Sequence, residues 1–215
     1  MPGGREGVRE GRACHKTGMT VMFTLQRTRV SCNRLSPDSN RDSVNKPQEL
    51  NSGAKQVDSS KVDVVVAPTA VHLGQVKSTL GSPYELSSQD VWIKGPGAYT
   101  GEVPAEILKD LGVGWTLTGH SERRAYCGET NEVVGQKTAR ALEAGLSVIP
   151  CIGESLEQRN SGQLFPVLSA QVQALVDNIQ DWSRIVVAYE PVWAIGTGVV
   201  ATPEQAQEVH AYLRK

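Results

Sequence analysis

The sequence predicts an α/β protein in which strand–helix units follow one another and build a parallel sheet covered by helices. Short apolar runs rich in β-branched residues, such as Val62–Ala67 and Ile185–Ala188, lack polar alternation. They therefore indicate strands that are buried on both faces. Longer segments with apolar residues at helical spacing lie between these runs. Because parallel crossovers are right-handed, such a series is able to curl into a barrel.

Five such units can be placed in order along the chain. The predicted strands are Val62–Ala67, Leu86–Val91, Trp115–Thr118, Leu146–Ile152 and Ile185–Tyr189. The predicted helices are Val71–Leu80, Pro104–Leu111, Asn131–Ala144, Leu164–Ile179 and Pro203–Leu213. Pro104 and Pro203 suit the first turn of a helix, and Gly145 supplies a stop. Five strands would leave the two apolar outer strands unpaired along one edge each, an arrangement that favours aggregation.

Residues 1–56 do not share this pattern, and we expect a disordered amino-terminal segment there, followed by the α/β unit over residues 57–215. The first fifty residues are rich in Gly, Arg, Ser and Asn, and only Val21–Leu25 suits a strand. Arg27–Asp42 resembles a transit peptide in its Arg and Ser content, although the acidic residues Glu6 and Glu10 argue against one.

Composition excludes several classes of function. The 215 residues carry a formal net charge of −1, which gives no reason to expect nucleic acid or a membrane surface as a partner. No apolar run approaches the length of a membrane span. The four cysteines form no CxxC pair and the four histidines no HxxxH pair, so we expect neither structural disulfides nor a zinc site.

Two polar residues follow predicted strands and are candidates for chemistry. Glu190 comes directly after Ile185–Tyr189, so its carboxylate is predicted at the rim of the sheet, where a closing loop would make it a suitable base. His120 follows Trp115–Thr118, and a helix beginning at Ser121 would keep it neutral and able to donate a hydrogen bond. Together they suit proton abstraction next to a carbonyl. Taken singly, each is about equally compatible with a structural role, as a salt-bridge glutamate or a core histidine.

Two longer motifs surround these residues. AYEPVWAIGTG (Ala188–Gly198) and GHSERR (Gly119–Arg124) resemble the two signature stretches of the triosephosphate isomerases. Supporting matches are GAYTGE (Gly97–Glu102), IPCIGE (Ile149–Glu154), DWS (Asp181–Ser183) and ATPEQAQEVH (Ala201–His210). The resemblance covers about Val62 to Lys215. It implies an incomplete TIM (β/α)8 barrel in which five of eight units are recognisable.

The resemblance also implies an activity. It is the interconversion of dihydroxyacetone phosphate and D-glyceraldehyde 3-phosphate in glycolysis and gluconeogenesis, without a cofactor or a metal. Glu190 would be the base and His120 the electrophile, an assignment for which this family is itself the standard example. Gly196, in a flap over Ala194–Gly198, would bind the substrate phosphate, while Glu122 and Cys151 would support the site. The compartment would be the cytoplasm or, alternatively, a plastid.

A homodimer through the loop Asp90–Pro104 is a further implication, with Thr100 near the loop tip. This loop reads GPGAYTGE where the family commonly has GGAFTGE, and Asp90 stands where asparagine is usual.

Parts of the family pattern are not found. An Asn-x-Lys pair expected on the first strand does not occur in Met1–Leu50, and the last two strands would lie beyond Lys215. We therefore expect a family member truncated at both ends and with little or no isomerase activity. The alternative is a non-catalytic truncated polypeptide. A third hypothesis, a glycosidase pair of Glu190 and Glu154, is disfavoured by the AIGTG loop and by the scarcity of aromatic sugar platforms beyond Trp193.

Overall fold

The computed structural model describes residues 19–22, 29–34, 40–195, 197 and 199–215. Within these residues, seven strands form one sheet in sequence order. Each neighbouring pair from β2 to β7 runs parallel, and β1 runs antiparallel to β2. The strands are β1 (Met19–Met22), β2 (Arg29–Arg34), β3 (Val62–Ala67), β4 (Tyr84–Ser88), β5 (Trp115–Thr118), β6 (Ser147–Ile152) and β7 (Ala188–Tyr189).

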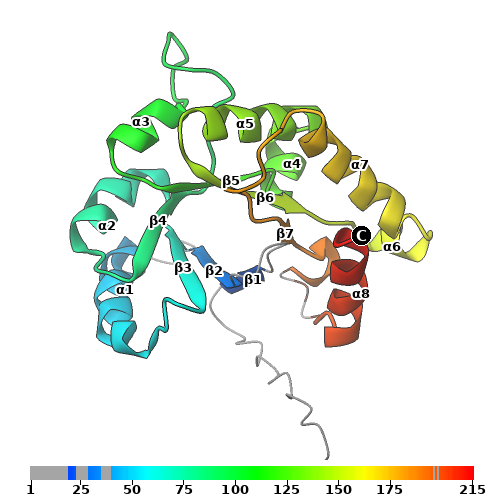
Figure 1. Cartoon of the computed structure of the whole chain (residues 1–215), viewed down its shortest axis with the longest axis horizontal. Coiled ribbons are helices and arrows are strands. Elements are labelled where there is room, and N and C mark those ends of the chain that lie inside the picture. The colour runs from blue at the N-terminus through cyan, green and yellow to red at the C-terminus, as the bar shows by residue number, and fades with distance from the viewer. Residues whose placement is uncertain (1–18, 23–28, 35–39, 196, 198) are drawn as a thin grey trace, which may run out of the picture.

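Helices lie around the outside of the curled sheet, so the molecule has the form of an open, partial barrel (Figure 1). This arrangement confirms the predicted α/β fold class. None of the helices in the described part of the chain is long and apolar enough to cross a membrane. The α-helices are α1 (Asn40–Gly53), α2 (Leu73–Thr79), α3 (Ala105–Asp110), α4 (Ser121–Cys127), α5 (Asn131–Glu143), α6 (Leu156–Asn160), α7 (Leu164–Val176) and α8 (Pro203–Leu213).

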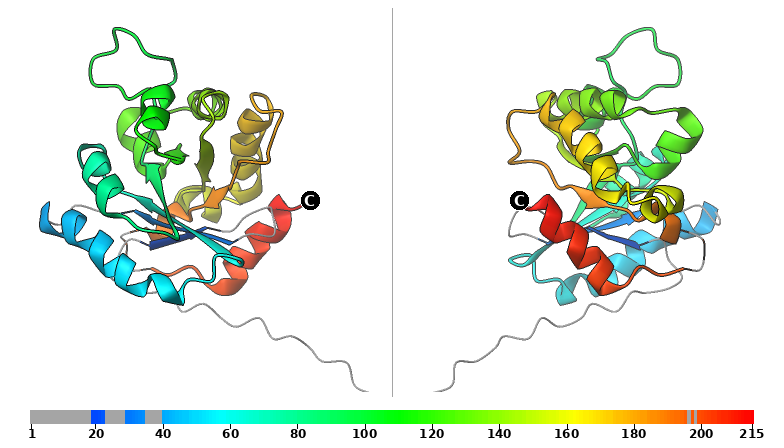
Figure 2. Two further views of the ribbon diagram at one scale, coloured as in Figure 1. Left: turned by 60° about the vertical axis from the view of Figure 1, so that its left-hand side comes forward. Right: turned by 90° about the vertical axis from the view of Figure 1, so that its right-hand side faces the viewer.

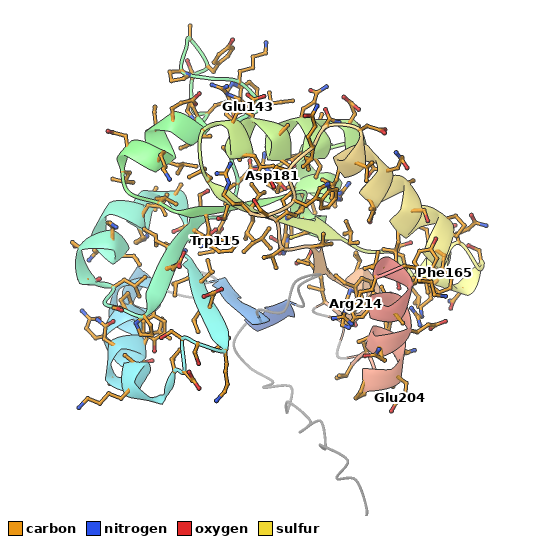
Figure 3. All side chains as sticks on the ribbon, in the orientation of Figure 1. Trp115, Glu143, Phe165, Asp181, Glu204 and Arg214 are labelled. Atoms are coloured by element: carbon orange, nitrogen blue, oxygen red, sulfur yellow. The ribbon has the colours of Figure 1, made fainter. Side chains whose placement is uncertain are left out.

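Alternate residues of the strands divide between two apolar layers. Ile149 and Cys151 of β6 join an inner cluster whose described members all lie on strands or next to them, whereas Val148 and Ile152 pack outward against residues of the helices. Both faces of the strand are therefore buried, which explains why its sequence is apolar without alternation. The outer layer continues toward the end of the chain, where Phe165 of α7 lies beside α8 (Figure 3) and packs against Tyr212 with ring centroids 4.3 Å apart.

Several predicted elements are confirmed. The bounds of β3, β5 and α8 agree with the prediction, and the predicted strand Leu86–Val91 is shifted toward the amino terminus to become β4. The strand begins earlier because Tyr84 and Glu85 pair with Val64 and Val65 of β3. Ser87 and Ser88, which both ranges include, are buried in the sheet, where the Ser88 hydroxyl donates to Thr116 Oγ1 at 2.7 Å. β7 is shorter than predicted, although Ile185 still forms an isolated parallel bridge with Val148.

The amino-terminal segment differs from the expectation of disorder over residues 1–56. The structure describes β1, β2 and α1 there, and β2 pairs with β3 from Arg29–Val62 to Arg34–Ala67 (Figure 2). The expectation that β3 is an unpaired edge is therefore wrong. Of the predicted strand at residues 21–25, residues 21–22 belong to β1 and the remainder lies outside the described residues. The boundary at residue 57 stays a prediction.

The helix α1 was not predicted, because polar contacts rather than a stripe of apolar residues attach it to the fold. The Asn51 side-chain amide donates to the Thr79 carbonyl at 2.7 Å and accepts from the Gly81 N–H at 2.8 Å. The Tyr84 hydroxyl donates to the Leu50 carbonyl at 2.6 Å. These bonds join the end of α1 to α2 and β4 without a long apolar stripe.

Candidate functional site

The two predicted site residues lie together at the carboxyl ends of β5 and β7. His120 follows β5 by two residues and Glu190 follows β7 directly. His120 Nε2 is 3.0 Å from Glu190 Oε1, and both residues are buried, with exposed fractions of 8% and 3%. Residues 70 positions apart in the chain therefore form one buried polar pair at the rim of the sheet.

The hydrogen bonds of His120 assign its tautomer. Its ring nitrogen Nδ1 accepts the backbone N–H of Glu122 at 3.2 Å and thereby caps α4, which begins at Ser121. A nitrogen that accepts a hydrogen bond carries no proton, so the proton of the neutral ring resides on Nε2. His120 consequently donates its Nε2–H toward Glu190.

Hydrogen bonds to the start of α4 and to the end of β6 hold Glu190 in place. Its Oε2 accepts the backbone N–H of Ser121 at 3.4 Å, and its own backbone N–H donates to the Ile152 carbonyl at 2.8 Å. The carboxylate thus faces the first turn of α4, with one oxygen on the histidine and the other on a backbone amide. This geometry places an acceptor for a proton beside a neutral donor.

A glycine beside this pair allows two backbones to approach closely. A β-carbon at Gly153, the residue after β6, would overlap the carbonyl oxygen of Glu190. The peptide groups of Gly153 are also fixed, because the Gln171 carboxamide accepts from its N–H at 2.8 Å and donates to its carbonyl at 3.0 Å. Absence of a side chain here determines where Glu190 lies.

A second buried carboxylate, Glu154, anchors the segment that follows Glu190. It accepts the Trp193 indole N–H at 2.8 Å, the Tyr189 hydroxyl at 3.1 Å and an Arg159 N–H at 3.0 Å. Burial, together with the Glu154 charge, raises the pKa of the Tyr189 hydroxyl well above its ordinary value, so this hydroxyl stays a donor. With its oxygens occupied in this way, Glu154 is poorly suited to be the second carboxylate of a glycosidase.

The predicted flap is only partly described. Gly196, the predicted phosphate-binding residue, lies outside the described residues, as does Gly198. Thr197 donates from its hydroxyl to the Trp193 carbonyl at 2.8 Å, and the Ile195 side chain is 44% exposed. Opening and closing of this segment stays a prediction.

A buried ionic cluster holds the base of the loop Asp90–Pro104. Lys137 Nζ contacts both Asp90 oxygens at 2.8 Å and Glu129 Oε1 at 2.7 Å. Arg123 binds the same two carboxylates, at 3.0 Å and 2.7 Å. Burial raises the pKa of Asp90, whereas for Glu129 the opposing effect of burial is outweighed by hydrogen bonds from Lys137 and Arg123, which lower its pKa.

The loop itself projects from the body of the molecule between β4 and α3 (Figure 1). Its base is closed by a hydrogen bond of 2.9 Å from the Trp92 N–H to the Val103 carbonyl. Beside it lies a cavity of about 490 Å³ whose lining includes Trp92, His120 and Tyr126. Tyr126 is 85% exposed, so an aromatic surface borders this cavity.

Sequence reasoning found His120 and Glu190 but missed the residues that hold them. The role of Gly153 was not recognised, because it depends on Glu190 and Gln171, which lie far along the chain. Glu122 and Cys151, the expected supporting residues, lie at the cap of α4 and within the inner cluster. Among the described residues, no group of three or more His, Cys, Asp or Glu side chains could hold a metal ion.

Comparisons with known proteins agree with these motifs. The family model described as triosephosphate isomerase matches residues 39–215. The chain is 52% identical over 174 residues to "Triosephosphate isomerase, cytosolic" of Oryza sativa subsp. japonica, covering 81% of this chain and 69% of the relative. It is 56% identical over 155 residues to "Triosephosphate isomerase, chloroplastic" of Secale cereale, covering 72% and 52%. The Arabidopsis thaliana chloroplastic relative is 52% identical, covering 81% and 55%. The chain thus spans about half the length of the two chloroplastic relatives.

Proposed function

The chain belongs to the triosephosphate isomerase family, and we propose that it interconverts dihydroxyacetone phosphate and D-glyceraldehyde 3-phosphate through an enediol. The observation that carries this proposal is the 3.0 Å contact between His120 Nε2 and Glu190 Oε1. It joins a carboxylate and a neutral N–H donor at the carboxyl ends of two parallel strands, where α/β barrels gather their reactive groups. The names of the cytosolic and chloroplastic relatives support the same substrate.

In the proposed reaction, Glu190 removes a proton from the carbon next to the carbonyl and returns it to the neighbouring carbon. His120 donates its Nε2–H to the carbonyl oxygen and stabilises the charge that develops there. Because only protons move, this chemistry uses no cofactor. In the structure, the carboxylate of Glu190 faces the Nε2–H of His120, so substrate binding must separate the two side chains.

The phosphate and the flap belong to the same proposal. Gly196 binds the substrate phosphate through its backbone N–H, and Ala194–Gly198 closes over the substrate to exclude water. Anchorage of Trp193 on Glu154 and the exposure of Ile195 support a segment that is held at its start and uncovered beyond it.

Proton abstraction can be measured directly on the 215-residue chain. Incubation with dihydroxyacetone phosphate in D2O, followed by NMR, reports exchange at the carbon next to the carbonyl even where turnover is slow. We expect exchange by the parent and a loss of about a hundredfold or more in Glu190→Gln, which lacks the base. Glu190→Asp draws the carboxylate back by roughly an ångström and should lower kcat about a hundredfold, with little change in KM.

The control is Glu157→Asp, the same substitution at an exposed position of α6. It should behave like the parent. A parent chain without exchange would overturn the proposed activity, and an unchanged kcat in Glu190→Asp would remove Glu190 from the mechanism.

We further propose a homodimer in which the loop Asp90–Pro104 of each subunit contacts the other subunit. The projecting loop, the adjacent cavity of about 490 Å³ and exposed Tyr126 support this proposal. Thr100→Glu should shift sedimentation from dimer to monomer, because a carboxylate buried without a partner is costly. Sedimentation of the parent as a monomer at all concentrations would contradict the dimer, and Glu143→Gln on exposed α5 surface is the control.

For its cellular setting, we propose glycolysis and gluconeogenesis in the cytoplasm, with a plastid as the alternative. Relatives with cytosolic and chloroplastic names support both compartments. Imaging of the full chain fused to a fluorescent protein distinguishes the two.

A further inference from the structure

Arg124, on α4, forms an unusually complete set of hydrogen bonds beside the proposed site. Its side chain donates through Nε to the Gly119 carbonyl at 2.8 Å, through Nη1 to Asn131 Oδ1 at 2.7 Å and through Nη2 to the Cys151 carbonyl at 3.2 Å. Each nitrogen of the planar guanidinium thus has an acceptor, which fixes the orientation of the group.

Arg124 contacts the backbone at the histidine in two ways, one through its side chain and one through its own helical backbone N–H. The side chain binds the Gly119 carbonyl, and the backbone N–H of Arg124 binds the His120 carbonyl at 3.1 Å. Gly119 has a φ of +63°, and a β-carbon there would lie 2.6 Å from Val134 Cγ1, so the turn into His120 is both unusual and crowded. Arg124 therefore stabilises the backbone turn that aims the imidazole.

The third acceptor reaches toward the glutamate. Cys151 belongs to β6, the strand between β5 and β7, and it pairs in register with Ala188. The next residue, Ile152, accepts the backbone N–H of Glu190. One guanidinium thereby joins the strand end that carries His120 to the strand that positions Glu190.

The electrostatic surroundings agree with this placement. Burial lowers the pKa of Arg124, while the nearby carboxylates of Glu129 and Glu190 act in the opposite direction. A guanidinium remains protonated even so, and it brings a positive charge to the side of Glu190.

We propose that Arg124 is a positioning residue that sets the tautomer and orientation of His120 relative to Glu190, a role that rests on the proposed function of that pair. Lysine keeps the charge but cannot donate in three fixed directions, so Arg124→Lys separates geometry from charge. Without the Gly119 contact, the turn relaxes and the bond from the Glu122 N–H to His120 Nδ1 weakens.

The chain offers a matched control in Arg184. Its guanidinium also donates to two backbone carbonyls, those of Leu146 at 3.1 Å and Leu142 at 2.8 Å, at the opposite end of β6. Arg184→Lys removes equivalent backbone contacts without touching the site. A structural role of Arg124 alone would make the two lysine variants behave alike.

The experiment measures the imidazole of His120 by ¹⁵N NMR in histidine-labelled full-length chain, with the signal assigned by its loss in His120→Gln. We expect the parent to show protonated Nε2 and unprotonated Nδ1, Arg124→Lys to show averaged tautomers, and Arg184→Lys to keep the parent pattern. In the exchange assay, Arg124→Lys should lower kcat by about tenfold to a hundredfold with little change in KM. Asn131→Ala, which removes only the acceptor that aims Nη1, should give the same change to a smaller extent.

Parent-like His120 signals in Arg124→Lys, or in Asn131→Ala if the lysine variant does not fold, would overturn the inference. Equal changes in Arg124→Lys and Arg184→Lys would overturn it as well. Absence of exchange by the parent would count against the proposed function alone, because the tautomer is measured without turnover.

Discussion

Gly153→Ala is expected to displace the proposed base and to destabilise the protein. The added β-carbon would overlap the Glu190 carbonyl oxygen, and the Gln171 clamp prevents Gly153 from moving away. The segment carrying Glu190 must therefore shift by about an ångström, which costs on the order of a hundredfold in kcat. Overpacking of this kind also lowers the free energy of unfolding by about 1–3 kcal/mol. The exchange assay and urea denaturation measure the two effects.

Gly74→Ala provides the control for this substitution. Gly74 lies in α2 on the surface, and a β-carbon there would meet nothing within 4 Å. Alanine favours a helix over glycine by roughly 0.5–1 kcal/mol, so this variant should be slightly more stable and fully active relative to the parent. If Gly153→Ala had the same activity and the same stability as Gly74→Ala, the close approach of Gly153 to Glu190 would not matter for function.

Lys137→Met is expected to lower the free energy of unfolding more than Gly153→Ala does. Lys137 is buried, with a side-chain exposed fraction of 3%, and it is the partner of both Glu129 and Asp90. Glu129 Oε2 has no hydrogen-bond partner among the described residues, so its charge depends on the cations at Oε1. Removing one partner of a buried ion pair leaves an uncompensated charge and lowers the free energy of unfolding by about 3–5 kcal/mol.

The pH dependence provides a second test of this substitution. Contact with Lys137 helps to hold the pKa of Glu129 below its ordinary value of 4.5, and its loss raises the pKa of the folded form. A carboxyl group with a raised folded-state pKa destabilises the fold at pH values above that pKa and ceases to do so below its unfolded pKa. The stability difference between parent and Lys137→Met should therefore narrow as the pH falls through the acidic range in which Glu129 of the variant takes up a proton.

Lys61→Met is the matched control, because Lys61 pairs with Asp58 on the surface, where its side chain is 79% exposed. We expect little change in stability, since water screens such a pair. Comparable losses in the two methionine variants would contradict the special cost assigned to the buried cluster.

Local pattern and motif were sufficient for much of the fold and for placing His120 and Glu190, the two proposed catalytic residues, at strand ends. The apolar run of β3 predicted its own bounds, because a buried parallel strand leaves a nearly continuous apolar signal in a short window. His120 and Glu190 were placed at strand ends from the same runs and from the family resemblance. The pattern placed β4 two residues too late, because Tyr84 and Glu85 belong to the strand through their pairing with β3 and not through an apolar run of their own.

By itself, then, the sequence determined the α/β order, the family and the identity of the two residues in the proposed reaction. Only the tertiary structure decided that β2 covers the edge of β3, that Lys137 meets Asp90 from 47 positions away, and how closely Gly153 approaches Glu190. The physical reason is that apolar burial leaves a periodic record within each element. By contrast, the stability of a buried charge depends on a partner residue that only folding brings close. The need for glycine at a close backbone contact likewise depends on a segment that is distant in sequence.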